Sequence, residues 1–276
     1  MRVVNLDQQV DQACADPDIA RAAALIADPS RARILKALCD GRAIPATVLA
    51  AEARVSPATA SAHLAKLVDA GLVTVRREGR NRYYELASTD VAAALEALAV
   101  ISPPLPVTSL RQSRHVDGLR RSRTCYDHVA GMLGVGLMRA LLDAQLLTGH
   151  NGVHPSTRAG RDRPASYGRD VRYEVTARGR SELRQFGVDL DGLPPRRPVT
   201  RYCVDWSERR QHHLAGALGA AMTHRLFDLG WVRPGRSPRV IQVTPSGVDG
   251  LERTFAMDVS SWREQVTGPP LLAAAR

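Results

Sequence analysis

The order of helix and turn signals across residues 19–86 constrains the fold more than any other feature of this chain. Residues 28–30, Asp-Pro-Ser, form a helix cap with proline in the first turn. Apolar residues then repeat at helical spacing until Gly41. A shorter helix around residues 48–50 follows, and a third begins at the cap formed by Ser56 and the proline after it. This order predicts a helix-turn-helix unit.

The predicted third helix, residues 58–70, has one apolar face formed by Leu64, Leu67 and Val68. The side chains outside that face are short, polar or basic, so the backbone can approach base edges in a DNA major groove. Ser56 would cap the helix and approach a phosphate. We therefore predict DNA contacts for Ser56, Ala58, Thr59, Ser61, Ala62, His63 and Lys66.

A basic hairpin is predicted after this helix. Residues 72–75 and 83–86 are typical of two short strands, and residues 76–82 of the turn between them. Four arginines at one tip repel each other unless a polyanion lies nearby, as a DNA backbone would. We expect Arg77, Arg80 and Arg82 to contact the DNA phosphates or the minor groove.

Two alternatives to sequence-specific DNA reading stay open. The unit could be a protein-interaction module without DNA contact, with His63 packed beside its helix and Lys66 an ordinary solvated charge. It could also belong to a DNA-packaging protein that binds through charge alone. A specific regulator should lose affinity for one sequence when Thr59 or Ser61 becomes alanine, whereas a packaging protein should respond mainly to Arg80→Ala and to salt.

The motifs at residues 27–35, 55–64 and 71–84 resemble the ArsR-like (ArsR/SmtB-type) winged-helix transcriptional regulators. The resemblance covers the first third of the chain. It implies a dimeric repressor whose first and last helices, about residues 18–27 and 88–101, pack against those of a second copy. Two recognition helices would then meet successive major grooves of double-stranded DNA.

The resemblance does not extend to the metal-sensing sites for which that family is known. Residues 48–54 lack the paired cysteines that such sites place before the recognition helix, and residues 89–96 contain no histidine. Soft or borderline metals need thiolate or imidazole ligands. Cys14 and Cys39 are isolated along the sequence. We therefore expect no metal sensing of that kind, and the effector stays unknown.

The charge balance agrees with a nucleic-acid partner. The chain has 38 Lys plus Arg against 28 Asp plus Glu, a net charge of +10. Arginine favours phosphate contacts, although a GC-rich genome also raises arginine content. No signal peptide or apolar run of membrane-spanning length is recognised, and four cysteines give no disulfide framework. We expect a cytoplasmic protein with no membrane partner, and find no catalytic motif that predicts an enzyme.

Two similar segments follow the proline cluster at residues 103–106. Residues 128–134 return as 213–219, and residues 175–179 return as 243–247, with a longer insertion in the first copy. We predict a winged helix-turn-helix domain at residues 1–104 and a regulatory or oligomerisation region at residues 105–276. That region would contain two repeated helix–hairpin–helix units, at about 120–192 and 200–262. The fold class is mainly α with small β-hairpins (α+β).

Cysteines and histidines near the openings of the two repeats give a metal hypothesis. If the repeats pack face to face, Cys125, His128, Cys203 and His213 could converge as a tetrahedral zinc-type site. The cysteine-to-histidine spacing is three residues in the first copy and ten in the second, which argues against symmetry. The alternative is buried thiols with each histidine hydrogen-bonded to a carbonyl or an aspartate. We therefore predict no cofactor, and zinc is a hypothesis to be tested.

A small organic effector is the second hypothesis for this region. Aromatic residues at the copy openings could line a pocket between the repeats, with Arg123 or Arg209 as an anion anchor. The alternative is that these aromatic residues fill the core. Glycines 131, 134, 216 and 219 would lie inside apolar helices with no preceding strand, which disfavours a nucleotide-binding turn. The aromatic residues in question are Tyr126, Tyr202, Trp206 and Trp231.

Overall fold

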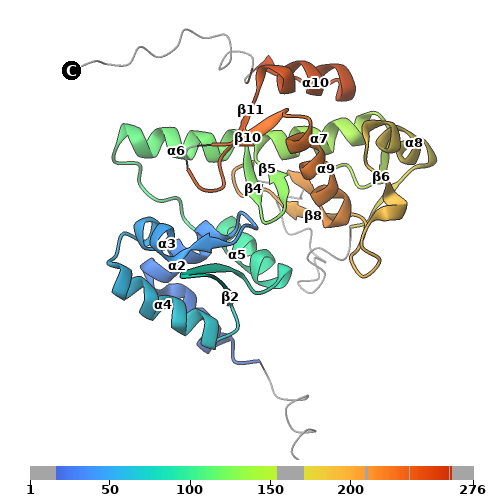
Figure 1. Ribbon diagram of the computed structural model, residues 1–276. Helices are drawn as coiled ribbons and strands as arrows, with labels where there is room; N and C mark the ends of the chain where they lie inside the picture. The colour runs from blue at the N-terminus through green and yellow to red at the C-terminus, as the bar shows by residue number, and fades with distance from the viewer. Residues whose placement is uncertain (1–16, 154–170, 209–210, 236, 261, 263–276) are drawn as a thin grey trace, which may run out of the picture. The chain divides into compact units, whose positions relative to one another are not determined.

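The structure, a computed structural model, describes residues 17–153, 171–208, 211–235, 237–260 and 262 (Figure 1). The chain divides into two compact units. The N-terminal unit holds the residues up to 36 together with 44–87, and the C-terminal unit holds 37–43 and the residues from 88 onward. Cys14 lies outside the described residues.

Two helices of the N-terminal unit begin at caps that the sequence predicted, at residues 28–30 and at Ser56. Helix α1 spans Ile19–Ala27, α2 Pro29–Leu38, α3 Ala46–Ala53 and α4 Pro57–Asp69. The carboxylate of Asp28 accepts hydrogen bonds from the backbone N–H of Ser30 and Arg31, both at 2.9 Å, at the start of α2. Helix α3 ends at Arg54 in the left-handed conformation. The core of this unit is fully buried Ile34, Leu35, Leu49, Leu64 and Leu67.

A three-stranded antiparallel sheet completes this unit. Strand β1 spans Ile44–Pro45, β2 Val73–Glu78 and β3 Asn81–Leu86, in the order β1-β3-β2. The predicted turn over residues 76–82 is wrong in extent, because cross-strand pairing continues to Glu78 and Asn81. The turn is therefore only Gly79 and Arg80. Gly79 has φ +59°, which lets a two-residue turn close the hairpin.

Helix α5, Thr89–Ile101, belongs to the C-terminal unit by its packing. It begins at the cap formed by Ser88 and ends before the proline cluster, as predicted. Glu96 of α5 is buried and forms an ion pair with buried Arg239. Burial raises the pKa of Glu96, but the charges of Arg239 and Arg123 more than offset this, so the pKa lies below its usual value.

The C-terminal unit contains two series of elements in the same order. Helix α6, Leu110–Arg121, precedes them. The first series is β4 (Arg123–Cys125), β5 (His128–Ala130), α7 (Met132–Asp143), β6 (Leu147–Gly149), β7 (Tyr173–Val175) and α8 (Ala177–Phe186). The second is β8 (Arg201–Val204), β9 (His212–Ala215), α9 (Gly216–Asp228), β10 (Val232–Pro234), β11 (Ile241–Val243) and α10 (Pro245–Phe255). The 3-10 helix Leu190–Gly192 lies between the two series. That the series arose by duplication stays a prediction.

Each series opens with a hairpin that the sequence analysis missed. Residues 128–130 and 212–215 are strands, so the expectation of glycines inside helices with no preceding strand is wrong at this point. The reason is that Gly131 and Gly216 have φ +74° and +84°, which turns each strand sharply into its helix. Figure 1 shows β4, β5 and β8 gathered beside α9.

A continuous apolar core joins the two series. It contains Leu133, Leu137 and Leu141 of α7 together with Leu218 and Leu226 of α9. Most of the first copy's predicted insertion, residues 154–170, lies outside the described residues. Among the described helices, none is both long and apolar enough to cross a membrane.

Candidate nucleic-acid interface

Helix α4 is fixed in the N-terminal unit by its cap and its apolar face. Ser56 accepts a hydrogen bond from the backbone N–H of Thr59 at 3.2 Å, and Pro57 occupies the first turn. This arrangement satisfies one of the free N–H groups at the helix start. Leu64 and Leu67 are fully buried, so the opposite face of the helix points outward.

The outward face carries most of the predicted DNA contacts. Ser56, Ala58, Thr59, Ser61, Ala62 and Lys66 are all exposed. The hydroxyl oxygens of Ser56 and Thr59 lie 2.8 Å apart, and the Ser61 hydroxyl donates to the Pro57 carbonyl at 2.9 Å. These small side chains keep close to the helix backbone. A groove-facing surface of this kind admits base edges with little steric obstruction.

His63 lies apart from that exposed set. Only 16 % of its side chain is exposed, and its Nδ1 lies 3.9 Å from Oδ1 of Asp28. The backbone hydrogen bond from Arg31 lowers the pKa of Asp28 most. Burial opposes this, and the charges of Arg31 and His63 lower the pKa further. His63 therefore packs α4 against the α1–α2 junction, as the alternative proposed, and its DNA contact stays a prediction.

The hairpin of β2 and β3, here called the wing, concentrates positive charge. Arg77 and Arg82 are direct cross-strand partners, and Arg80 lies in the turn. All three are exposed, and within the described chain none of them forms an ion pair. Arg76, by contrast, pairs with Glu78 at 2.9 Å. Like charges directly opposed on a hairpin are unfavourable, so a phosphate beside Arg77 and Arg82 would relieve the repulsion.

The structure brings the four metal candidates of the sequence together. One possible ligand atom from each of Cys125, His128, Cys203 and His213 lies within 4.8 Å of all the others. Cys125 is the cross-strand partner of His128, and Cys203 that of His213. The argument from unequal spacing is therefore wrong. The longer β8–β9 connection absorbs the extra residues and leaves the pairing equivalent.

Sequence reasoning offered an aspartate or a carbonyl beside each histidine as the alternative to a metal site, but it did not name the aspartates and gave Arg123 another role. Asp127 and Asp205 each lie beside one of the two histidines, and Arg123 is completely buried against Asp205. Burial raises the pKa of Asp205, but hydrogen bonding to His213 and the Arg123 charge hold it far below its usual range. The signal that could have found them is an aspartate close to a Cys/His pair at the start of each repeat.

The proposed aromatic pocket is not assembled as expected. Arg123, the suggested anion anchor, is committed to Asp205 and lies 4.2 Å from the ring of Trp206. Tyr202 stacks on His212, and Trp231 packs against Phe186. Arg209 lies outside the described residues. These contacts favour the core-filling alternative.

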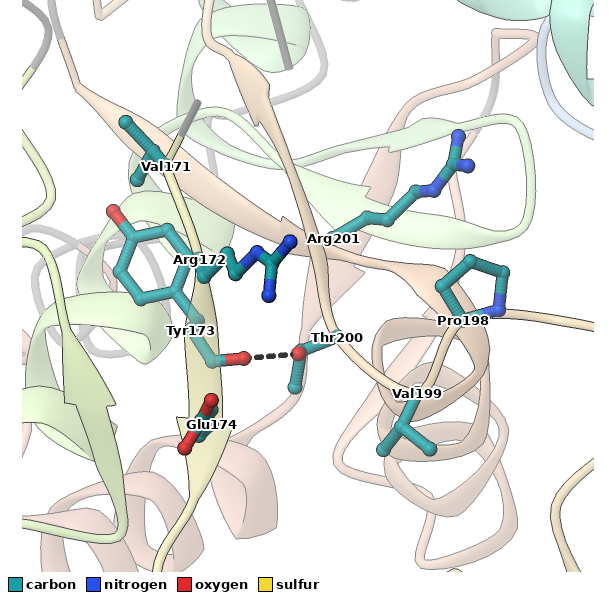
Figure 2. Close-up of a pocket in the computed structure, with 8 residues that line it drawn as sticks. All are labelled: Val171, Arg172, Tyr173, Glu174, Pro198, Val199, Thr200 and Arg201. Atoms are coloured by element: carbon teal, nitrogen blue, oxygen red, sulfur yellow. Dashed lines mark hydrogen bonds between the residues drawn. The ribbon is translucent and has the colours of Figure 1, made fainter. Parts of the chain in front are cut away.

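A different pocket lies between β7 and the start of β8 (Figure 2). The Thr200 hydroxyl donates to the Tyr173 carbonyl across it. None of the predicted pocket residues lines this space, so it gives the organic-effector hypothesis no support. Its lining residues are Val171, Arg172, Tyr173, Glu174, Pro198, Val199, Thr200 and Arg201.

The remaining thiol of the described chain is unsuited to metal binding by itself. Cys39 is buried, and burial raises its pKa to about 12. Helices α3 and α5 carry no cysteine or histidine. That the chain does not sense metals at the family's usual positions stays a prediction.

An exposed recognition helix followed by a basic two-stranded wing defines a winged-helix DNA-binding protein. The helix-turn-helix domain family matches residues 26–76. The HTH-type transcriptional regulator YdfF of Bacillus subtilis (strain 168) is 38% identical over 239 residues, which cover 86% of this chain and 97% of YdfF. The chain therefore belongs to the HTH-type transcriptional regulators.

Other relatives match a smaller share of the chain. The HTH-type transcriptional regulator CmtR of Mycobacterium tuberculosis (strain ATCC 25618 / H37Rv) is 41% identical over 83 residues, 30% of this chain and 70% of CmtR. A solved fragment of Mb0332 from Mycobacterium bovis, a homodimeric winged helix-turn-helix domain of a possible ArsR-family regulator, is 31% identical. It covers 36% of this chain and 86% of that one, with a TM-score of 0.29, too low to carry an argument.

Proposed function

We propose that this regulator is a sequence-specific repressor that binds double-stranded DNA as a homodimer in the cytoplasm and is released by an effector. The observation that carries the proposal is the combination of an open α4 face with three wing arginines that form no ion pair with any described residue. The α4 face supplies contacts to base edges, and the wing arginines supply contacts to phosphates. Helix α4 therefore reads the DNA sequence, and the wing positions the protein on the duplex. Catalysis has no place in this scheme.

The α4 surface supports reading of sequence over binding by charge alone. Thr59 and Ser61 offer hydroxyls, and Ala58 and Ala62 offer methyl groups that can pack on thymine. Lys66 at the last turn can reach a phosphate. A protein that only packages DNA has no need of such a small, mixed surface.

Helix α1 supports the dimer. It is rich in apolar residues, yet none of its residues is buried, and Ile19 is 76 % exposed. Leu25 and Ile26 are half-buried. An apolar helix on the surface of a small unit is typical of a subunit interface. The resemblance to ArsR-like regulators implies a dimer contact at this helix and at the last helix of the winged unit, about residues 88–101.

The test is fluorescence-anisotropy titration of DNA from upstream of the protein's own gene, against a shuffled duplex, over a salt series. We expect a preference of about a thousandfold or more for the native DNA. Thr59→Ala should reduce the preference, and Arg80→Ala should weaken binding to both duplexes. Arg111→Ala, which removes an exposed arginine from α6, is the matched control and should change neither.

Two outcomes would overturn the proposal. Equal, steeply salt-dependent binding to both duplexes would assign the protein to DNA packaging. No binding to either duplex would assign the winged unit to protein interaction. Once specific binding is measured, the same titration identifies the effector as the compound that releases the DNA by changing the spacing of the two winged units.

A further inference from the structure

Two hairpins of the C-terminal unit each place a cysteine opposite a histidine. Cys125 pairs with His128 across β4–β5, and Cys203 pairs with His213 across β8–β9. Residues directly opposed in an antiparallel pair present their side chains on the same face. Each hairpin therefore presents one thiol and one imidazole side by side. Strands β5 and β9 are in contact, so the two pairs meet.

The separations agree with four ligands around one ion. All four ligand atoms lie within 4.8 Å of one another. Sγ of Cys203 lies 3.6 Å from Nε2 of His128. With Zn–S near 2.3 Å and Zn–N near 2.0 Å, a tetrahedral site puts sulfur and nitrogen ligands about 3.5 Å apart. This pair already has the separation that binding to a common ion requires.

Both histidines are oriented by carboxylates. Asp127 Oδ1 lies 3.2 Å from Nδ1 of His128, and Asp205 Oδ2 lies 3.0 Å from Nδ1 of His213. A histidine that binds a metal through one ring nitrogen usually donates the other N–H to a carboxylate or carbonyl. With Nδ1 of each ring facing an aspartate, Nε2 is the nitrogen left for an ion.

The two carboxylates are themselves held by arginines. Arg197 forms two hydrogen bonds with Asp127, one of them at 3.0 Å. Arg123 donates to Asp205 at 3.0 Å, and both side chains are fully buried. Each histidine thus lies beside an aspartate held by an arginine, although Arg197 precedes the second repeat and Arg123 of the first repeat holds Asp205 of the second. Such support fixes the direction in which each imidazole points.

One histidine of the cluster has an unmet requirement. Nδ1 and Nε2 of His213 are both buried and make no hydrogen bond within the described chain, and Nε2 is the nitrogen that does not face Asp205. His213 has no exposed surface, so solvent does not reach it. A buried polar atom without a partner costs free energy. An ion bound on this nitrogen and on the thiols of Cys125 and Cys203 would meet the requirement.

The helices that follow the hairpins leave room for this arrangement. A Cβ atom at Gly134 of α7 would lie 2.4 Å from the Val129 carbonyl oxygen and 3.2 Å from Cβ of His213. One at Gly219 of α9 would lie 2.7 Å from the Leu214 carbonyl oxygen and 3.3 Å from Cβ of His128. These glycines let each helix approach its own preceding strand and the histidine of the other repeat, rather than forming a phosphate loop.

The chemistry of the donor set selects the class of ion. Two thiolates and two imidazoles are the ligands of structural zinc, and their two negative charges neutralise a dication in a buried site. Without a cation, hydrogen bonding to the Cys203 thiol and burial raise the pKa of Cys125 to about 12. Zinc binding would release the two thiol protons to solvent.

We propose that Cys125, His128, Cys203 and His213 bind one zinc-class dication in a closed tetrahedral site that joins the opening hairpins of the two repeats. Four protein ligands leave no position for a substrate, so the site is structural. Cys203 is only half-buried, which gives the ion its path inward. The proposal does not depend on DNA binding.

The test uses the untagged full chain. Purified protein, reduced and then supplied with zinc and dialysed, is analysed by elemental mass spectrometry. We expect about one zinc ion per chain, and less than about a tenth in the Cys125→Ser/Cys203→Ser double variant. Cys39→Ala removes a buried thiol outside the cluster and is the matched control that keeps the metal.

Cobalt substitution and a ligand swap separate coordination from folding. Co²⁺ in the wild type should give the intense visible bands of tetrahedral geometry and a sulfur-to-cobalt charge-transfer band, which Cys203→Ser should reduce by about half. His128→Cys should retain the metal through a third thiolate, whereas His128→Ala should lose it.

Three results would overturn the proposal. The first is less than about a tenth of an equivalent of zinc in the reduced, zinc-supplied wild type. The second is full zinc retention in the double cysteine variant. The third is a Cys125–Cys203 disulfide that, once reduced, gives a protein unable to bind zinc or cobalt.

Discussion

Replacing Arg77 with alanine should make the wing more stable and DNA binding weaker at the same time. Arg77 and Arg82 are exposed cross-strand partners, and neither forms an ion pair within the described chain. Relief of like-charge repulsion at a directly opposed pair is worth roughly 0.2–1 kcal/mol. We therefore expect Arg77→Ala to raise the free energy of unfolding slightly, or leave it unchanged, in a urea titration.

The DNA affinity should change in the opposite direction and by an amount that depends on salt. A dimer presents two wings, and each lost phosphate contact lowers the salt slope by about 0.9, so the slope should fall by about 1.8. Between 0.2 and 0.05 M salt the affinity ratio of wild type to variant should then widen by about 12-fold. Anisotropy titration at the two salt concentrations measures this ratio.

The control for this experiment is Arg111→Ala, which removes equal charge from α6. It should leave the salt slope unchanged. An Arg77→Ala variant with an unchanged slope, or one that unfolds more easily while binding DNA normally, would show that the arginine serves the hairpin and not the phosphates.

Further predictions concern the cores and the cluster. Leu64→Ala leaves a cavity under α4 and should cost roughly 2–5 kcal/mol of stability in urea titration. Glu96→Ala leaves Arg239 buried without its partner and should cost roughly 3–5 kcal/mol. The pKa of Glu96 is lower in the folded than in the unfolded protein, so its ion pair with Arg239 stabilises the protein fully at pH values above the unfolded-state pKa. This stabilisation is lost as the pH falls through the folded-state pKa. In Glu96→Gln, this contribution to the fall of the thermal unfolding temperature in acid should be absent. Asp127→Asn should weaken zinc binding by about 10–100-fold in a competition titration, by loosening His128.

The N-terminal unit could be predicted closely because its signals are local. Caps such as Ser56 and Asp28 mark where helices begin through bonds to backbone groups two or three residues away. The apolar positions Leu64 and Leu67 fix which face of α4 turns inward. Even here the length of the wing strands was missed, because cross-strand pairing, rather than the residue types at 76–82, decides where a hairpin turns.

The position of His63 shows the limit of this local reasoning. Helical spacing placed His63 near the outward face, but in the structure its side chain is mostly buried and lies beside Asp28 of a preceding segment. A sequence pattern reports the angle of a side chain around its own helix. It does not report which neighbour occupies the space beside it.

By itself the sequence determined the winged helix-turn-helix, its basic wing and the identity of four Cys and His residues that could share an ion. Only the tertiary structure decided that these four meet, because their approach depends on the cross-strand register of two hairpins more than seventy residues apart in the chain. Along the chain, Cys125 and His128 are three residues apart, whereas Cys203 and His213 are ten residues apart. In the folded hairpins both pairs are direct cross-strand partners, because a longer connection can return the second strand to the same register.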